Sequence, residues 1–232
     1  MIHGLTGDHS QMGKYDSLAQ MLSQRGITSL RFDCRGRGKS KNAGEFTIRH
    51  MIDDIRLAYQ YLIEDLKGKT GTDSSKAFFV ARGEGVFSAF IALYSYPIIA
   101  KICWAAIPYP LTSREIQGHY HEYRQHGFAT LEISVDESYR LESDFFEDLR
   151  EFDDAYHFVN RDDKILFIHP EKDEIHPLKY IEEFIEKIQE KIKLEQPPLL
   201  RLIKDAGHPH QEKAYLDYYL THTINFVDTY II

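Results

Sequence analysis

The feature that most constrains the fold is the stretch from Lys76 to Phe87, where one apolar run passes into another across a glycine-containing corner. Residues 76–80 are rich in aromatic and β-branched side chains, which predicts a buried strand. Residues 86–96 are largely apolar and stop at Pro97, which predicts a helix. A strand, a sharp turn and a helix form the elbow that presents a serine in G-x-S-x-G sequences. The five corner positions here are Ala81, Arg82, Gly83, Glu84 and Gly85, so the nucleophile position holds a glycine.

The rest of the chain alternates between strand-like and helix-like segments, which predicts an α/β fold with a mostly parallel sheet flanked by helices. The length of 232 residues suits a single domain. Further strands are expected at 27–33, 101–107, 164–169 and 199–203, and further helices at 15–25, 47–67, 180–192 and 213–230.

The alternation lapses between Pro108 and Asp163, a span rich in tyrosine, histidine and acidic residues. In an open parallel sheet, an insertion after a strand lies over the carboxyl edge, where ligands bind. We therefore expect residues 108–163 to form a small cap. The alternative is a surface excursion with no role in substrate binding.

Composition limits the partners that the chain can have. A formal net charge of −8 argues against binding to nucleic acids or to membrane surfaces, since both require a basic face. The sequence shows neither an apolar run of membrane-spanning length nor the pattern of a signal peptide, and Cys34 and Cys103 are far apart, so a cytoplasmic location is expected. His119 and His121 lack a ligand spacing typical of metal sites, and we expect neither a metal nor a cofactor.

Four further segments resemble motifs of the α/β-hydrolases, in the order in which that family has them. The resemblance covers nearly the whole chain and implies the α/β-hydrolase fold of a serine esterase. The segments are His3-Gly4-Leu5-Thr6-Gly7 (oxyanion loop), Arg31 to Ser40 (F-D-x-R-G-x-G-x-S loop), His169 to Pro177 (acid segment) and Asp205-Ala206-Gly207-His208 (histidine segment). Tyr139, Phe145, Phe146, Asp148 and Leu149 also look like the cinnamoyl- and feruloyl-esterase branch.

Carried over from this resemblance, His208 would be the general base and Asp173 the carboxylate that orients it. The backbone N–H groups of Leu5 and Glu84 would stabilise the oxyanion, with the Glu84 side chain pointing away. Asp173 could instead cap a turn before the next helix, and His208 could be an ordinary loop residue. His3 is expected to stabilise its loop rather than to transfer protons.

Gly83 is the decisive departure from the family pattern, because a glycine cannot form an acyl-enzyme. Ser88 and Cys34 are not expected to replace the missing hydroxyl. The sequence leaves three explanations open: a natural pseudoenzyme that binds a small acyl or ester compound or a partner in its cleft, a His208–Asp173 dyad that activates water or a substrate proton, and a laboratory change of serine to glycine.

A second departure lies at the beginning of the chain. The family has strands before the His-Gly loop, whereas only Met1 and Ile2 precede it here. Either upstream sequence is missing from this chain, or the sheet is smaller than usual. An incomplete sheet would expose a strand edge, which could pair with a second copy of the chain to form a homo-oligomer.

Overall fold

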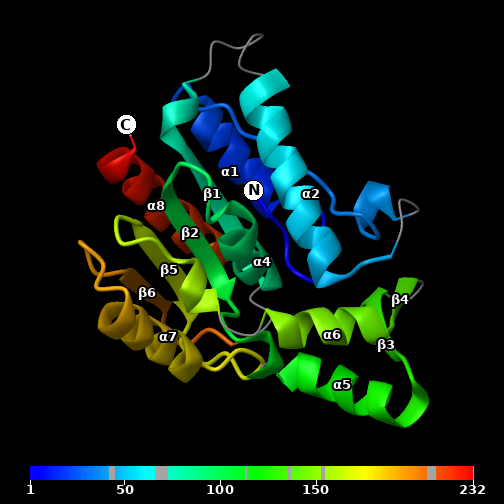
Figure 1. Ribbon diagram of the computed structural model, residues 1–232. Coiled ribbons are helices and arrows are strands. Elements are labelled where there is room, and N and C mark those ends of the chain that lie inside the picture. Colours follow the sequence, from blue (N-terminus) through cyan, green and yellow to red (C-terminus); the bar gives the residue numbers. More distant parts are fainter. Residues whose placement is uncertain are drawn as a thin grey trace.

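The centre of the molecule is a four-stranded parallel sheet with strand order β1-β2-β5-β6 (Figure 1). The computed structural model describes residues 1–41, 45–65, 73–112, 114–134, 137–152, 155–207 and 213–231. The strands are β1 (Ala77–Gly83), β2 (Ile98–Ala106), β5 (Ile165–Pro170) and β6 (Leu199–Ile203). The predicted mostly parallel sheet flanked by helices is confirmed.

Each face of the sheet has its own hydrophobic core, because successive side chains along a strand point to opposite faces. Phe79 and Ala81 of β1 lie in one core, together with Phe87 of the following helix. Phe78 and Val80 lie in the other. The continuous apolar runs of the sequence follow from this arrangement, since parallel strands covered on both faces have no polar side.

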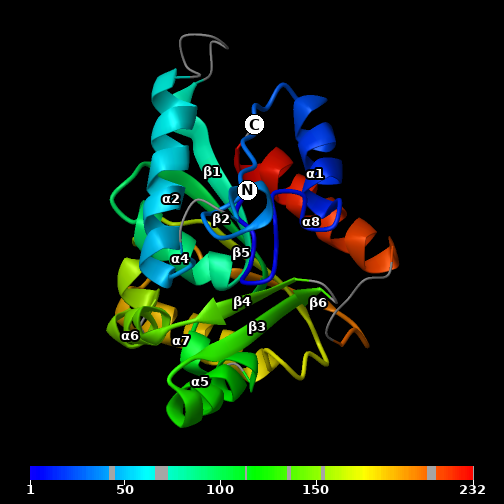
Figure 2. The same ribbon diagram turned by 90° about the vertical axis from the view of Figure 1, so that its right-hand side faces the viewer.

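The helices cover both faces, as Figure 2 shows. On one face α1 (Lys14–Ser23) packs with α8 (Lys213–Tyr230), and Trp104 of β2 donates a hydrogen bond to Thr223 beneath them. On the other face lie α2 (Ile48–Gln60), α4 (Glu84–Leu93) and α7 (Leu178–Lys191). Beyond Gln60, α2 continues as the π-helix Tyr61–Asp65. Short 3-10 helices lie at Gly38–Ser40, Ser74–Lys76, Pro110–Thr112 and Ala155–Phe158.

Between β2 and β5 the chain forms a separate group of elements beside the sheet (Figure 1). These are α5 (Arg114–His126), the antiparallel hairpin of β3 (Ala129–Ser134) and β4 (Glu137–Leu141), and α6 (Ser143–Glu151). Aromatic rings join α5 to α6: Tyr123 stacks on Phe146 with ring centroids 4.5 Å apart. In the part of the chain that the structure describes, no helix is long and apolar enough to cross a bilayer.

The predicted strand at 27–33 is wrong, because these residues do not form a ladder with a neighbouring strand. Ile2 lies on the side of β1 that faces them and forms an isolated parallel bridge with Ala81. The nitrogen of Met1 donates to the carbonyl of Leu30 at 2.8 Å. Extended backbone needs a hydrogen-bonded neighbour to count as a strand, and these two residues supply too little of one.

Two helix boundaries also differ from the sequence-based expectation. The helix after the corner begins at Glu84 instead of residue 86, because Gly83 is its N-cap. It ends at Leu93 instead of residue 96. The helix expected at 47–67 is α-helical only from Ile48 to Gln60. Residues 66 and 67, with which that prediction ends, lie outside the described residues.

Candidate functional site

The carboxyl end of β1 forms a sharp elbow at Gly83. Its backbone angles are φ 56° and ψ −131°, a conformation that L-residues rarely adopt, and α4 begins at the next residue. A Cβ atom added at Gly83 would lie 3.7 Å from the Gly4 Cα and 3.9 Å from the Ile107 side chain. The position therefore has room for a side chain and imposes backbone strain on it.

The loop that begins at His3 lies directly against this elbow. Ile2 donates a hydrogen bond to Val80 O (2.9 Å) and accepts one from Arg82 N–H (3.1 Å), which fixes the start of the loop beside β1. Gly85, in the first turn of α4, is packed so closely that a Cβ atom there would lie 3.0 Å from the His3 carbonyl carbon and closer still to its oxygen. Only glycine fits at that contact.

The backbone N–H of Leu5, expected to bind an oxyanion, donates instead to the Glu84 carboxylate at 3.1 Å. The expectation that the Glu84 side chain points away is therefore wrong. Glu84 is 4% exposed, and its carboxylate lies at the first turn of α4. A buried N–H needs an acceptor, and a negative charge is favoured at a helix N-terminus, so both ends of this contact have a physical cause.

Arg37 binds the carbonyl group of the same residue, Leu5, in the following peptide unit. Its Nε donates to Leu5 O at 2.6 Å, and its Nη1 donates to Gly36 O at 3.0 Å. The guanidinium lies over the rings of Phe46 (3.9 Å) and of Tyr139 in β4 (4.3 Å). Burial lowers its pKa to about 10, with smaller opposing contributions that include Tyr139 and Glu84. Arg37 thus joins the His3–Gly7 loop to the β3–β4 hairpin.

His3 has a structural role in this arrangement, because both ring nitrogens are bonded to backbone. Its Nδ1 donates to Gly4 O at 2.8 Å, since a carbonyl can only accept, and its Nε2 accepts from Cys34 N–H at 3.1 Å. Burial lowers the pKa of His3 below its ordinary value, against a weaker opposing effect of the Gly4 carbonyl. The Cys34 thiol is buried, which raises its pKa, and Ser88 is buried within α4. Neither is a reactive group at the elbow.

Asp173 lies in the loop after β5. Because the strands are parallel, this loop is at the same edge of the sheet as the elbow. Asp173 is buried, and its Oδ1 accepts from Ile175 N–H (3.0 Å) and His176 N–H (2.9 Å), which is the turn-capping role considered as an alternative.

The segment that leads to His208 runs beside the Asp173 loop. Lys172 N–H donates to Ala206 O at 2.8 Å, and Gly207 lies near the Lys172 carbonyl. His208 itself lies outside the described residues. The structure therefore brings Gly83, Glu84 and Leu5 together and places Asp173 at the same edge of the sheet, while the pairing of Asp173 with His208 stays a prediction.

Sequence reasoning missed the two charged side chains nearest to Leu5. Arg37 belongs to a loop whose glycine pattern drew attention, but a buried arginine is uncommon and no sequence signal marks it. Glu84 occupies the position after the elbow residue, where an acidic residue in an otherwise apolar segment could have been noticed in the sequence. The N–H donor of Leu5 is therefore already occupied by a carboxylate of the same chain, that of Glu84.

Comparison with known proteins places this geometry in one fold. No family model matches the sequence, and no curated protein matches it. The structure is similar to a putative hydrolase from Agrobacterium vitis S4, with a TM-score of 0.70 and 15% identity over 97% of this chain and 86% of the other. It is also similar to the esterase Pf2001 of Pyrococcus furiosus (TM-score 0.69, 16% identity, 100% and 82% covered). A further similar structure is Est1E of Butyrivibrio proteoclasticus with bound ferulic acid, with a TM-score of 0.67 and 16% identity over 98% of this chain and 88% of the other.

These similarities span nearly the whole chain, and the neighbours are hydrolases and esterases. The chain therefore has the α/β-hydrolase fold, as its motifs imply. At this level of identity the likeness establishes the fold alone, so the chemistry has to be argued from the residues of this chain.

Proposed function

We propose that the chain is an esterase-like protein that binds a small acyl or ester compound in its cleft and does not hydrolyse it through an acyl-enzyme. The observation that carries this proposal is the hydrogen bond from Leu5 N–H to the Glu84 carboxylate, one residue after a glycine at the nucleophile position. Both halves of the usual chemistry are affected: the attacking hydroxyl and the donor for the oxyanion.

The carboxylate matters as much as the missing serine. An oxyanion hole works because its donors are aimed at a developing negative charge and need no reorganisation when the charge appears. Here Leu5 N–H already has an anionic acceptor, so an oxyanion would have to displace Glu84 and meet its charge at close range. Arg37 binds the carbonyl of Leu5, so the loop has little freedom to adjust.

The proposed class of ligand is supported by the fold and by the predicted cap at residues 108–163. Tyr139 of the hairpin reaches the Arg37 guanidinium, so this insertion contacts the loop next to the elbow. Est1E holds ferulic acid, an aromatic carboxylic acid, and a small aromatic acyl compound is therefore the first ligand to test.

A second candidate function is a His208–Asp173 dyad that activates water without a protein nucleophile. The observation in its favour is that Asp173 is buried and held by two backbone N–H groups, which would keep an orienting carboxylate in place. Such an enzyme would lose its hydrolytic activity on substitution of His208 or Asp173. Substitution of Glu84 would change that activity through the Leu5 N–H group, independently of the dyad.

The two candidates are separated by measuring labelling, turnover and binding on the same protein. We expect no labelling of the unmodified chain by a fluorophosphonate, with an active serine esterase as reagent control, and no turnover of p-nitrophenyl butyrate above that of His208→Asn. Ferulic acid should bind in a calorimetric titration, and Glu84→Gln should tighten its binding, because a like charge is removed.

Clean phosphonate labelling would refute the inert cleft and direct the search to another hydroxyl. Turnover that disappears in both His208→Asn and Asp173→Asn would favour the dyad enzyme. Absence of binding for ferulic acid and for butyrate, in the presence of a folded protein, would contradict the proposed small acyl ligand.

A further inference from the structure

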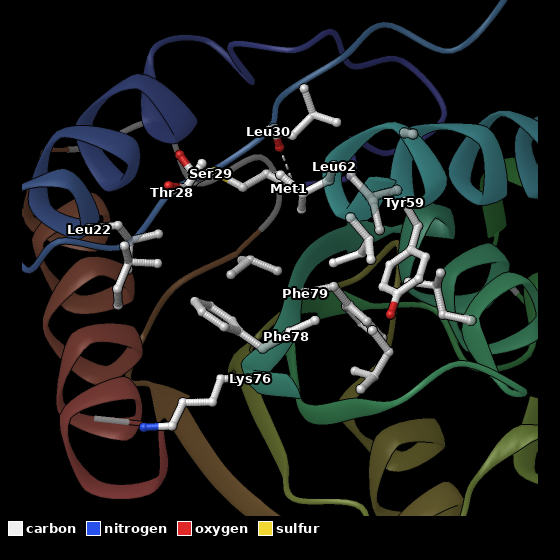
Figure 3. A pocket seen from close by; sticks show the side chains of 18 of the residues that line it. Met1, Leu22, Thr28, Ser29, Leu30, Tyr59, Leu62, Lys76, Phe78 and Phe79 are labelled. Atoms are coloured by element: carbon white, nitrogen blue, oxygen red, sulfur yellow. Dashed lines mark hydrogen bonds between the residues drawn. The ribbon is translucent and has the colours of Figure 1, made fainter. Parts of the chain in front are cut away.

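The side chains around β1 change in character along the strand. Along its amino half lies a largely apolar groove of about 370 Å³, which Figure 3 shows between Leu22 of α1 on one side and Tyr59 on the other, beside Phe78 of β1. Toward the carboxyl end of the strand, the layer between the sheet and α1 contains two positively charged side chains instead, those of Lys14 and Arg82. This charged end of the layer lies next to the elbow.

Arg82 points toward α1, because alternate side chains of a strand lie on one face of the sheet. Phe78 and Val80 belong to the hydrophobic core under α1 and α8, and Arg82 is the next residue in this series. Trp104, its partner in β2, lies in the same core. The Arg82 side chain is half-buried, and its Nε is buried without an acceptor among the described residues.

Lys14 reaches the same layer from the helix. It is the first residue of α1 and shares the buried face of the helix with Tyr15, whose ring centroid lies 5.5 Å from that of Trp104. The Tyr15 hydroxyl donates to Ile2 O at 2.8 Å, and the same oxygen accepts from Arg82 N–H at 3.1 Å. The start of α1 is therefore held beside the carboxyl end of β1, with Lys14 next to Arg82.

Neither cation has a counter-charge in the part of the chain that the structure describes. The Lys14 residue is 6% exposed, and neither its amine nor the Arg82 guanidinium forms a hydrogen bond or an ion pair with a described residue. Burial and the charge of Arg82 lower the pKa of Lys14 to about 8. A carboxylate partner would raise this pKa instead.

The acidic side chains of the adjoining segments are bound elsewhere. Asp8 accepts from the N–H and the hydroxyl of Ser10, and Asp16 in the first turn of α1 pairs with Arg31. Asp173 accepts from two N–H groups of its own turn. Uncompensated charges in a buried layer cost stability, and the N-terminus of α1 adds a further preference for a negative charge. An anion between the two cations would compensate them.

The chemistry of the two side chains indicates which anion they would bind. A guanidinium presents a planar fork of N–H donors that matches the oxygens of a carboxylate or a phosphate, and an ammonium group adds a compact charge with three donors. Such contacts are stronger in a partly buried site than at the surface, because less water screens them. Arg82 keeps part of its surface exposed, so an anionic group can reach it from outside.

We propose that Lys14 and Arg82 bind the oxyanion group of a small ligand, a carboxylate or a phosphate, between the start of α1 and the carboxyl end of β1. The site lies on the α1 face of the sheet, whereas Leu5 and Phe87 of the elbow region pack in the opposite core. The proposal therefore does not rest on the proposed function, and it stands even if the cleft at the elbow binds no acyl compound.

The test is a calorimetric titration of the full chain with three ligands that share one aromatic ring: benzoate, phenyl phosphate and the neutral benzamide. Sodium chloride keeps the ionic strength constant, because exposed charges respond to it. We expect saturable binding of at least one anion, about tenfold or more tighter than that of benzamide. Binding of benzoate alone or of phenyl phosphate alone supports the proposal and identifies the anionic group.

Lys14→Met and Arg82→Gln remove the two charges one at a time. Each should weaken anion binding at least about tenfold, which corresponds to 1.4 kcal/mol, and leave any benzamide binding within about twofold. The matched controls are Lys204→Met and Arg201→Gln, at exposed positions, which should leave the affinity for the anions within about twofold. Circular dichroism of each variant should match that of the wild type.

Lys14→Met also provides a measurement without ligand. Methionine is apolar and of similar length, so removal of an uncompensated buried charge should raise the Tm in the absence of the anion. The anion that binds the wild type should raise the Tm of the wild type and no longer raise that of the variant. A variant with a lower Tm than the wild type would show that the amine already has a partner in the chain, and it would overturn the proposal.

Three further results would contradict an anion site. The first is absence of saturable binding for both anions, and the second is benzamide binding as tight as that of the anions. The third is anion binding that Lys14→Met and Arg82→Gln leave unchanged, which would place the ligand elsewhere on the chain.

Discussion

The two halves of β1 have opposite surroundings. At the carboxyl end, Gly83 and the start of α4 are enclosed by the chain's own groups: the His3 carbonyl against Gly85, and the Glu84 carboxylate on Leu5 N–H. Along the amino half, the same strand borders a cavity of about 370 Å³. One strand thus supports an elbow whose backbone is closely packed at Gly85 and, along its other half, an open groove.

The comparison shows that the loss of a hydroxyl and a loss of packing need not go together. The elbow has no hydroxyl, yet its glycines, its histidine and its buried arginine are all in close contact. The groove lies at the β1 edge of the sheet, and its walls are largely hydrophobic. Changes at the elbow should therefore cost stability, and added side chains in the groove should increase it.

The largest effect is expected for Gly85→Ala. The new methyl group meets the His3 carbonyl, and backbone on both sides prevents either from moving away. We expect a loss of about 3 kcal/mol in the free energy of unfolding, at the upper end of the range for overpacking, measured by urea denaturation. The control is Gly118→Ala in α5, where a Cβ atom meets nothing within 4 Å and a gain of about 0.5–1 kcal/mol is expected. Equal effects at the two sites would contradict the close contact at the elbow.

Arg37→Lys tests the clamp on Leu5. Lysine keeps the charge but cannot hold Leu5 O and two aromatic rings with a planar fork, so we expect a loss of about 2 kcal/mol in urea denaturation. Arg49→Lys is the matched change at a half-exposed arginine that lies over Phe152, and it should alter stability by less than about 0.5 kcal/mol. A neutral Arg37→Lys would show that the guanidinium contributes little.

The pH dependence of stability tests the burial of His3. Burial lowers its pKa in the folded chain, so below pH 6.5 the unfolded chain binds a proton that the folded chain does not. Stability from this group is complete above pH 6.5 and is lost as the pH falls from there toward the lowered pKa. We expect wild type to lose about 1 kcal/mol more than His3→Gln between pH 7.5 and 5.5, within the 1.36 kcal/mol per pH unit that one proton allows.

The control for this measurement is His121→Gln, at an exposed position in α5. It should reproduce the wild-type pH dependence of the free energy of unfolding. A His3→Gln variant with an unchanged pH dependence would contradict a neutral, buried imidazole in the loop next to the elbow.

The smallest effect, and one of opposite sign, is expected in the groove. Ala58→Leu adds apolar volume to an existing cavity and should stabilise the chain by about 0.5–1 kcal/mol in thermal denaturation. Gln60→Leu adds a leucine at an exposed position of the same helix and should change stability by less than about 0.5 kcal/mol. A destabilised Ala58→Leu would mean that the walls of the groove are already in contact.

The strands of the sheet could be predicted from the sequence because each is a short apolar run between helical segments. Residues 27–33 have the same character and still do not form a strand. Composition indicates that a segment could form a strand, whereas strand pairing depends on a neighbour that lies elsewhere in the chain. The cavity between residues 27–30 and β1 is the physical reason why residues 27–33 have no strand beside them.

The elements between β2 and β5 were harder to predict. Residues 114–126, which form α5, are polar along most of their length, and their apolar side consists only of Ile116, Tyr120 and Tyr123. Residues 129–134 and 137–141 are two short runs, and alternation over so few residues is a weak signal.

The candidate site was likewise predictable only in part. The motif order located the elbow, the His3 loop and the Asp173 loop, because their glycine spacing and chain order have geometric meaning. The direction of the Glu84 side chain could not be read, since it depends on an N–H donor 79 residues away. For the same reason, the stacking of Arg37 between two distant rings was not predictable.

The most direct test of the occupied donor is the hydrolysis of p-nitrophenyl butyrate by Gly83→Ser and by the double variant Gly83→Ser/Glu84→Ala. If the carboxylate holds Leu5 N–H, the serine alone gives little activity. Removal of the Glu84 carboxylate in the double variant should then raise kcat/KM about a hundredfold, the effect of one oxyanion donor. Full activity of Gly83→Ser with no further gain in the double variant would show that Glu84 does not block the site.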